Sequence, residues 1–235
     1  MGGMLRRDWN AVITEGVGTF LFFFVGMGAA VAAGGSLVTV ALAHGLVLAV
    51  LVSSLGAVSG AHFNPAVTFA VWISGNLDGR RAIAYILAQC IGGIVAGVAL
   101  ASFYPIETGL GLPALATGLD PGTGLFIEAI LTAVLLVAVF GTAIDPRAPK
   151  VGGIAIGFAV GGDILMGGPL TGAAMNPARW LGPAITTNHL ENAHVWILGP
   201  IIGALLIALL YRSILKPEAN VERTSGDPQP EDDIS

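Results

Sequence analysis

Two polar blocks interrupt this otherwise apolar chain and contain the residues best placed to do chemistry. Residues 59–70 read SGAHFNPAVTFA and residues 171–182 read TGAAMNPARWLG, one block in each half. The triplets that they share are Asn64, Pro65 and Ala66 in the first half and Asn176, Pro177 and Ala178 in the second. Asn is favoured just before the first turn of a helix, and Pro suits the first helical position, whose N–H has no partner within the helix. Each triplet therefore predicts a helix start with an amide side chain at its tip.

A second set of candidates consists of ionisable side chains within apolar stretches. They are Glu15, His44, Glu128, Asp163 and Arg179. Such groups are costly at membrane depth and by default suggest a function there. Glu15 and Glu128 occupy matching places in the two halves, because each is followed four residues later by a threonine. Part of this second set is therefore duplicated as well.

Other kinds of chemistry are excluded by what the chain lacks. Cys90 is the only cysteine, so the chain can form neither an internal disulfide nor a cysteine metal site. No metal-binding, phosphate-binding or dinucleotide-binding motif is present, and no nucleophile, base and orienting group recur in a recognisable arrangement. We therefore expect no enzyme activity, no cofactor, no metal and no binding of nucleic acid.

The elements that must position these residues are membrane helices. The chain has 235 residues, of which 54% are hydrophobic and 11% charged, and its mean hydropathy is +0.82. Six stretches are long enough to cross a hydrocarbon core, which needs roughly 20 apolar residues per helix. They run at about 9–33, 37–57, 81–103, 122–143, 151–168 and 194–215. The sequence therefore predicts an all-α membrane protein with six transmembrane helices.

Two shorter apolar pieces, at residues 65–73 and 177–186, each begin at the proline of a triplet. At about 1.5 Å per residue they reach only about half of a ~30 Å hydrocarbon core. We expect each to form a re-entrant half-helix, which enters the membrane as a loop and returns as a short helix. Non-helical backbone is tolerated at that depth only where it is buried in protein or lines a watery cavity.

The chain consists of two copies of one unit, at about 9–103 and 122–215. Because each copy contains three spans, the second enters the membrane from the opposite side, and the repeats are inverted. Inversion brings the N-terminal ends of the two half-helices together, and their dipoles, on the order of half a charge each, disfavour cations there. We expect one membrane domain, residues 1–216, followed by a disordered polar tail, residues 217–235.

The positions of lysine and arginine set the orientation, because cytoplasmic loops hold an excess of them. With six crossings, nine of the ten basic residues fall on one side, which places both termini in the cytoplasm. The exception is Arg179, directly after the second triplet. An arginine at membrane depth against this rule needs a local reason.

The paired blocks SGAHFNPAV and TGAAMNPAR in inverted halves resemble the aquaporin (major intrinsic protein) family over residues 9–215. The resemblance implies two half-helices that meet at the centre of a pore, and a homotetramer in which each subunit has its own pore. It assigns Asn64 and Asn176 as donors to a passing water oxygen, and the loops at about 59–63 and 171–175 as sources of carbonyl acceptors. A water held by two donors cannot accept a proton from its neighbour, so water passes while protons do not.

The resemblance also assigns an outer selectivity filter, which consists of His44, Ile164, Ala173 and Arg179. Arg179 supplies fixed donors and a charge that repels cations. Ile164 stands where strictly water-selective members typically have histidine, which implies a wider and more apolar pore. Together the filter residues resemble those of some tonoplast intrinsic proteins, several of which are thought to pass ammonia beside water.

Other positions carry either a departure from the family or more than one interpretation. Trp180 stands where glycerol facilitators typically have aspartate, so the glycerol signature is absent, and the sequence offers no account of the tryptophan. The family residues that match Glu15 and Glu128 orient the carbonyl-bearing loops, and we expect that role here, with proton coupling as the alternative. His62 either braces its loop, which we favour, or responds to pH.

The predicted function is a passive channel for water that excludes protons and ions, with ammonia and other small neutral solutes as its wider range. The alternatives are a glycerol- or urea-type facilitator, a proton-coupled secondary transporter that uses Glu15, Glu128 and Asp163, and a structural junction protein. The expected partners are water, small neutral solutes, membrane lipid and further copies of the chain. The short termini and the absence of a targeting motif favour a bacterial or archaeal plasma membrane.

Overall fold

Long helices make up most of the protein. The computed structural model describes residues 6–149 and 151–215, and no strand occurs among them. The long helices are α1 (Arg6–Ala32), α2 (Leu37–Ser59), α4 (Gly79–Ala101), α5 (Pro121–Val139), α6 (Gly152–Thr171) and α8 (Ala193–Leu210). π-Helical turns at Phe140–Ile144 and Tyr211–Leu215 extend α5 and α8, and a short 3-10 helix, Ile106–Gly111, lies between α4 and α5.

Six of the described helices, counted with these extensions, are long and apolar enough to cross a membrane. The predicted spans are therefore confirmed, with ends that shift by a few residues. The predicted tail, residues 217–235, lies outside the part of the chain that the structure describes.

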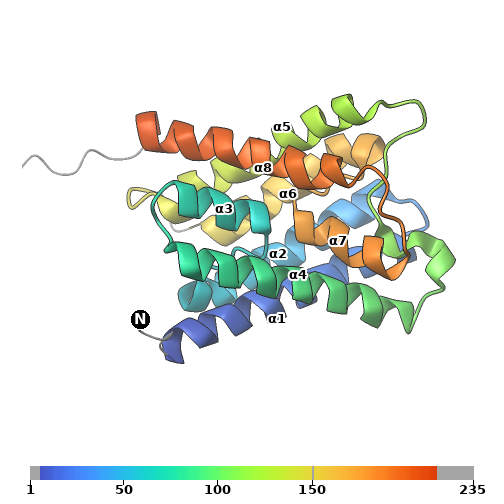
Figure 1. Cartoon of the computed structure of the whole chain (residues 1–235), viewed down its shortest axis with the longest axis horizontal. Helices are drawn as coiled ribbons and strands as arrows, with labels where there is room; N and C mark the ends of the chain where they lie inside the picture. Colours follow the sequence, from blue (N-terminus) through green and yellow to red (C-terminus); the bar gives the residue numbers. More distant parts are fainter. Residues whose placement is uncertain (1–5, 150, 216–235) are drawn as a thin grey trace, which may run out of the picture.

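Two short helices, α3 (Pro65–Ile73) and α7 (Pro177–Thr186), have the bounds that the sequence predicted for the half-helices. In Figure 1 they lie in line with each other, between α8 and α4, and both of these long helices contact both short ones. Asn64 precedes α3, and its side-chain oxygen accepts a hydrogen bond from Ala66 N. Asn176 caps α7 in the same way, and a proline follows each asparagine at the first helical position. The short local signal of cap and proline was therefore sufficient to locate both helix starts.

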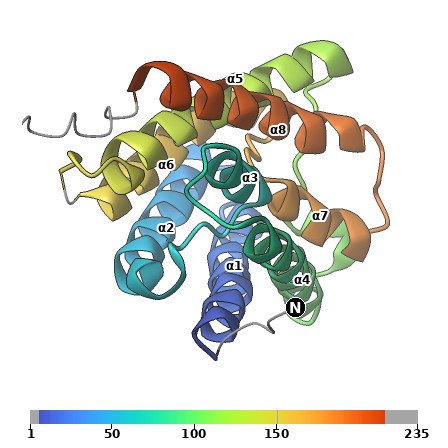
Figure 2. The ribbon, with the colours of Figure 1, turned by 60° about the vertical axis from the view of Figure 1, so that its left-hand side comes forward.

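Helix packing follows the internal repeat. α1 packs against α4 as α5 packs against α8, and α4 packs against α7 as α8 packs against α3. Figure 2 shows α3 enclosed by the long helices of both halves. α2 and α6 pack extensively against each other. Because a Cβ atom on Gly157 would lie 2.4 Å from the Gly45 carbonyl oxygen, glycine is required for this close approach. The fold is two inverted repeats, each of three long helices and one half-helix.

The outside of the bundle is apolar. Large hydrophobic side chains exposed on it include Ile13, Val50, Ile91, Phe158 and Leu206. Soluble proteins rarely expose so extensive an apolar surface, whereas lipid tails solvate it well. The described chain begins and ends on the same side of the molecule, at the left of Figure 1. The protein is an integral, multi-pass membrane protein.

Candidate functional site

A cavity of about 570 Å³ lies inside the bundle and is lined by both re-entrant loops. Asn64 and Asn176 line it, and so do all the residues assigned to the filter, which are His44, Ile164, Ala173 and Arg179. Toward the end of the bundle where α5 stops, the lining includes Thr142 and Gly152. The fold therefore brings the triplet asparagines and the filter candidates to one continuous space, although they lie far apart in the sequence.

The two asparagines each reach across to the other repeat. Asn64 Nδ2 donates to the Met175 carbonyl at 2.9 Å, and Asn176 Nδ2 donates to the Phe63 carbonyl at 3.0 Å. Each amide nitrogen carries two hydrogens, so each keeps a second N–H beside the cavity. Each side-chain oxygen is already used as a helix cap. The amides therefore present N–H donors to the cavity.

Glu15, on α1, holds the loop that leads to Asn64. Its carboxylate accepts hydrogen bonds from Ser59 Oγ at 2.6 Å, from His62 N at 2.9 Å and from Phe63 N at 2.7 Å. Gln89 on α4 donates to the same carboxylate at 2.8 Å. Glu15 is fully buried, so these bonds replace the water that an isolated carboxylate would need.

Glu128, on α5, holds the second loop in the same way. Its carboxylate accepts from Thr171 Oγ1 at 2.7 Å, from Ala174 N at 2.9 Å and from Met175 N at 2.7 Å. The donors occupy the places that Ser59, His62 and Phe63 occupy in the first loop. The fold thus reproduces in three dimensions the duplication of the two glutamates in the sequence.

These bonds also set the direction of the loop carbonyls. In a trans peptide the C=O of one residue points opposite to the N–H of the next, and no cis peptide occurs in the described chain. Because the N–H groups of His62 and Phe63 point at Glu15, the carbonyls of Ala61 and His62 point away from it. By the same reasoning the carbonyls of Ala173 and Ala174 point away from Glu128. All four of these residues line the cavity, which therefore has backbone acceptors along both loops.

The loops are strained in the same pattern. Ala61 and Phe63 have φ values of 50° and 48°, and Ala173 and Met175 have φ values of 44° and 53°. A left-handed conformation costs a non-glycine residue of order 1–3 kcal/mol and persists where the surroundings over-determine it. The buried glutamates and the crossed asparagine bonds provide that constraint.

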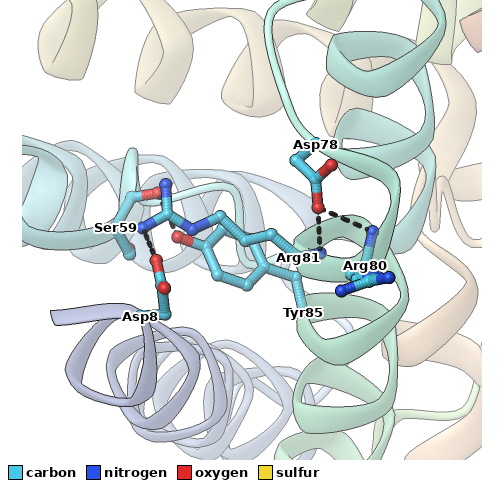
Figure 3. Close-up of polar contacts among 6 residues, drawn as sticks. All are labelled: Asp8, Ser59, Asp78, Arg80, Arg81 and Tyr85. Carbon is cyan, nitrogen blue, oxygen red and sulfur yellow. Dashed lines mark hydrogen bonds and ion pairs between the residues drawn. The ribbon is translucent and has the colours of Figure 1, made fainter. Parts of the chain in front are cut away.

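Contacts from α4 brace the first loop from behind, as Figure 3 shows. Tyr85 Oη donates to the Ser59 carbonyl at 2.8 Å, and Arg81 pairs with Asp8 of α1 at 2.6 Å. Asp78 caps α4 through Arg80 N and Arg81 N. The end of α2 is therefore tied to α4, and α4 is tied to α1.

His62 lies within this braced region. Its Nδ1 is 3.1 Å from Thr68 Oγ1, and its ring meets Tyr85 edge-on with centroids 5.6 Å apart. Gln89 donates to the same threonine hydroxyl at 2.8 Å. His62 is 9% exposed and borders the cavity. These contacts favour the bracing interpretation of His62 over the pH-sensing one.

His44 and Arg179, two of the residues assigned to the filter, contact each other. His44 Nδ1 is 2.9 Å from the Val40 carbonyl, and Arg179 Nε is 3.4 Å from His44 Nε2. Phe22 meets the imidazole edge-on, with centroids 5.9 Å apart. Arg179 Nη1 is buried and has no hydrogen-bond partner among the described residues. Arg179 as a residue also lines the cavity.

The structure accounts for Trp180, which the sequence left unexplained. The indole is 2% exposed and stacks on Trp196 of α8, with centroids 6.0 Å apart and an interplanar angle of 9°. Trp196 Nε1 donates to the Thr171 carbonyl at 3.0 Å. This bond is the counterpart of the one from Tyr85 to Ser59, at the end of α6 instead of α2. Sequence reasoning missed this pair, and the aromatic residues at 85 and 196 are the signal that could have revealed it.

Asp163 stands apart from the cavity residues. Its side chain is 5% exposed, Oδ2 has no hydrogen-bond partner in the described chain, and the residue is not part of the cavity lining. No group of three or more His, Cys, Asp or Glu side chains within residues 6–149 and 151–215 could hold a metal ion. Asp163 is therefore not one of the residues that line the cavity, although it lies within electrostatic reach of Glu128.

The fold and the cavity define a class of protein: a multi-pass helical membrane channel built from inverted repeats whose half-helices carry an Asn-Pro-Ala start. The family model for the major intrinsic protein matches residues 5–211. The chain belongs to the major intrinsic protein family, the aquaporins, which are channels and not enzymes.

The chain is similar to several members of this family along nearly its whole length. Aquaporin TIP4-4 of Zea mays is 40% identical over 237 residues, which cover 95% of this chain and 92% of that protein. Probable aquaporin TIP3-2 of Arabidopsis thaliana is 41% identical, with 90% and 85% covered. The lens fiber major intrinsic protein of Lithobates pipiens is 42% identical, with 89% and 82% covered.

Among solved structures, the aquaglyceroporin from Plasmodium falciparum has the same fold. Its TM-score is 0.76 at 23% sequence identity, with 88% of this chain and 97% of that chain covered. The recognition of the family and of its fold from the paired blocks is confirmed.

Proposed function

We propose that the chain is a passive channel for water, with ammonia and other small neutral solutes in its wider range. The observation that carries the proposal is the pair of amide donors on Asn64 and Asn176, which meet one cavity at the starts of two half-helices. The names of the relatives, several of them aquaporins from plants and animals, support water as the first solute.

Protons and other cations are excluded at the same place. A water molecule between the two amides accepts a hydrogen bond from each and points its own hydrogens toward the loop carbonyls. With both lone pairs occupied, it cannot accept a proton from the next water along the file. The positive ends of α3 and α7 and the charge of Arg179 further disfavour a cation. Water therefore passes without a continuous path for protons.

The filter sets the solute range. Arg179 keeps free donor capacity, whereas Ile164 and Ala173 present apolar surface to the cavity. Because one side of the filter has few polar groups, it holds water less tightly. It therefore also admits ammonia, which is a weak hydrogen-bond donor. Trp180 is buried against Trp196 and does not line the cavity, so it adds no polar group to the solute path.

The buried glutamates act as loop-orienting residues. Glu15 and Glu128 each accept three hydrogen bonds from their own loop, so neither carboxylate is free to exchange protons with a solute. This arrangement favours a channel over a proton-coupled transporter. None of the three carboxylates that such a transporter would use, Glu15, Glu128 and Asp163, lines the cavity.

The assembly and the location are further parts of the proposal. We propose a homotetramer, with both termini in the cytoplasm, on the strength of the family resemblance and of the arginine distribution. The bacterial or archaeal plasma membrane stays a prediction from the sequence, and the relatives named above come from plants and animals.

The test is reconstitution of the purified protein into vesicles, with light scattering after osmotic shocks and a pH-sensitive dye inside. We expect water permeability with a low activation energy, no saturation, no dependence on an ion gradient and no dissipation of a proton gradient. Ammonia, glycerol and urea are compared in the same vesicles. Uptake that requires an ion gradient would contradict the channel, and glycerol or urea flux comparable to that of water would reassign the solute.

A further inference from the structure

The contact between His44 and Arg179 depends on which nitrogen of the imidazole carries a hydrogen. A backbone carbonyl can only accept, so the 2.9 Å contact to Val40 O requires His44 Nδ1 to be the donor. In the neutral ring Nε2 is then an acceptor, and Arg179 Nε–H donates to it across 3.4 Å. Both ring nitrogens are engaged within the protein, so His44 offers no N–H to a solute.

The place of the imidazole is decided by a residue outside the filter. A Cβ atom on Gly26 of α1 would lie 2.5 Å from both Cδ2 and Nε2 of His44 and 2.8 Å from Cε1. Carbon atoms pack favourably at about 3.5–4.0 Å, so even a methyl group would force the ring to move by about 1 Å. Phe22, one turn earlier on α1, meets the same ring edge-on. Phe22 and Gly26 therefore form the wall against which the imidazole lies.

We propose that Gly26 is a selectivity-determining residue of this channel. Because Gly26 has no side chain, the His44 ring lies against α1, where its Nε2 accepts the Arg179 Nε–H and holds the guanidinium in place. His44 is accordingly a positioning residue, and Arg179 alone supplies the side-chain donors of the filter. This inference rests on the proposed function and adds a fifth position, on α1, that acts on the filter through His44.

The test is a double-mutant comparison in proteoliposomes, with osmotic water permeability and methylamine permeability measured on the same preparations. Gly26→Ala pushes the ring away from α1 and into the cavity, so we expect both permeabilities to fall several-fold and the methylamine-to-water ratio to fall as well. His44→Ala removes the ring and should raise that ratio. Adding Gly26→Ala to His44→Ala should change nothing further, because the methyl group then meets no imidazole.

The matched control is Gly28→Ala on the same helix. Its Cβ atom would meet only the flexible end of Leu100, at 3.3 Å, so the permeability ratio should match that of the wild type. Two results would overturn the inference. One is an effect of Gly26→Ala that is the same with and without His44, and the other is an unchanged methylamine-to-water ratio in a folded Gly26→Ala protein.

A folding failure is also informative. If Gly26→Ala is not recovered as folded protein but the double variant is, the clash with His44 is established. If neither variant folds, Gly26 serves another contact and the inference is wrong. If vesicles with the wild-type protein are no more permeable to water than empty vesicles, the proposed function itself is wrong. If the wild type conducts water but Gly26→Ala leaves the methylamine-to-water ratio unaltered, only the inference is wrong.

Discussion

At the scale of single residues, the groups that hold the two re-entrant loops match between the two halves of the chain. Ser59 and Thr171 occupy matching places, as do Glu15 and Glu128, and their hydrogen bonds are alike. The difference lies one turn into the half-helices, where Val67 in the first becomes Arg179 in the second. Both side chains line the cavity, so this difference contributes to the asymmetry of the path.

Ile164 offers a direct test of the assigned filter. Ile164→His replaces an apolar wall with a larger polar ring, so we expect methylamine or ammonia permeability to fall while most water flow is kept. The measurement is stopped-flow uptake of each solute into the same proteoliposomes. The control is Val160→Ile, which alters an aliphatic residue one turn away in the same cavity and should leave the solute ratio nearly unchanged. Equal selectivity of wild type and Ile164→His would reject the assignment of this position.

At the scale of the elements, backbone contacts between helices fix where the half-helices sit. α4 packs against α7 through Gly93 and Gly182, and a Cβ on Gly182 would lie 2.2 Å from the Gly93 carbonyl oxygen. Backbone atoms cannot turn aside as a flexible side chain can. The position of Asn176 at the tip of α7 therefore depends on a residue with no side chain further along the same helix.

Gly182→Ala should destabilise the protein through this contact. Inserting a methyl group into a well-packed site costs typically about 1–3 kcal/mol, so we expect a lower thermal unfolding temperature in detergent. The control is Gly162→Ala, since a Cβ at Gly162 meets nothing within 4 Å. Equal unfolding temperatures for the two variants would show that α7 can shift away from α4 without loss.

A polar tie joins the α5–α6 loop to the end of α8. Arg147 pairs with Asp145 at 2.6 Å, and its Nη2 also donates to the Leu215 carbonyl at 2.7 Å. We expect Arg147→Ala to speed hydrogen exchange of the loop several-fold, measured by mass spectrometry. Arg80→Ala is the control, because the recorded hydrogen bond of this exposed arginine is made by its backbone N–H. No change in loop exchange would show that the tie does not restrain the loop.

The same tie has a defined dependence on pH. Hydrogen bonds from Arg147 lower the pKa of Asp145 from 3.8 to about 2. A carboxyl whose pKa is depressed in the folded state stabilises it above the unfolded pKa and loses that effect as the pH falls toward the folded one. The loop should therefore keep its protection against hydrogen exchange as the pH falls from neutral to 3.8. It should lose that protection only between pH 3.8 and about 2.

At the scale of the whole molecule, the inverted repeat explains both the path and the orientation. Two copies that enter from opposite sides bring the starts of α3 and α7 to one cavity, as neither copy alone could do. Because six crossings are an even number, the described chain returns to the side where it began. The distribution of lysine and arginine then predicts that this side is cytoplasmic.

Single cysteines test that orientation. In a Cys90→Ala background, Asn188→Cys places a thiol after α7 and Ser213→Cys places one at the far end of α8, and both positions are exposed. We expect a membrane-impermeant maleimide to label the first in intact cells and the second only after the membrane is opened. Labelling in the reverse order would invert the proposed topology, and equal labelling of both would contradict a membrane crossing by α8.

The sequence by itself determined the helices and their starts. Long apolar runs, an asparagine before a proline and short apolar pieces are local signals, so the six spans and the bounds of α3 and α7 could be predicted closely. The duplicated glutamates could be paired with their loops for a related reason, since the repeat assigns one to each.

Only the tertiary structure decided the contacts between elements. The His44–Arg179 bond, the Trp180–Trp196 stack and the space that Gly26 leaves for an imidazole each join residues from different helices. No local pattern encodes them, because hydrogen bonding and close packing depend on where two backbones lie relative to each other, which is settled only when the helices come together.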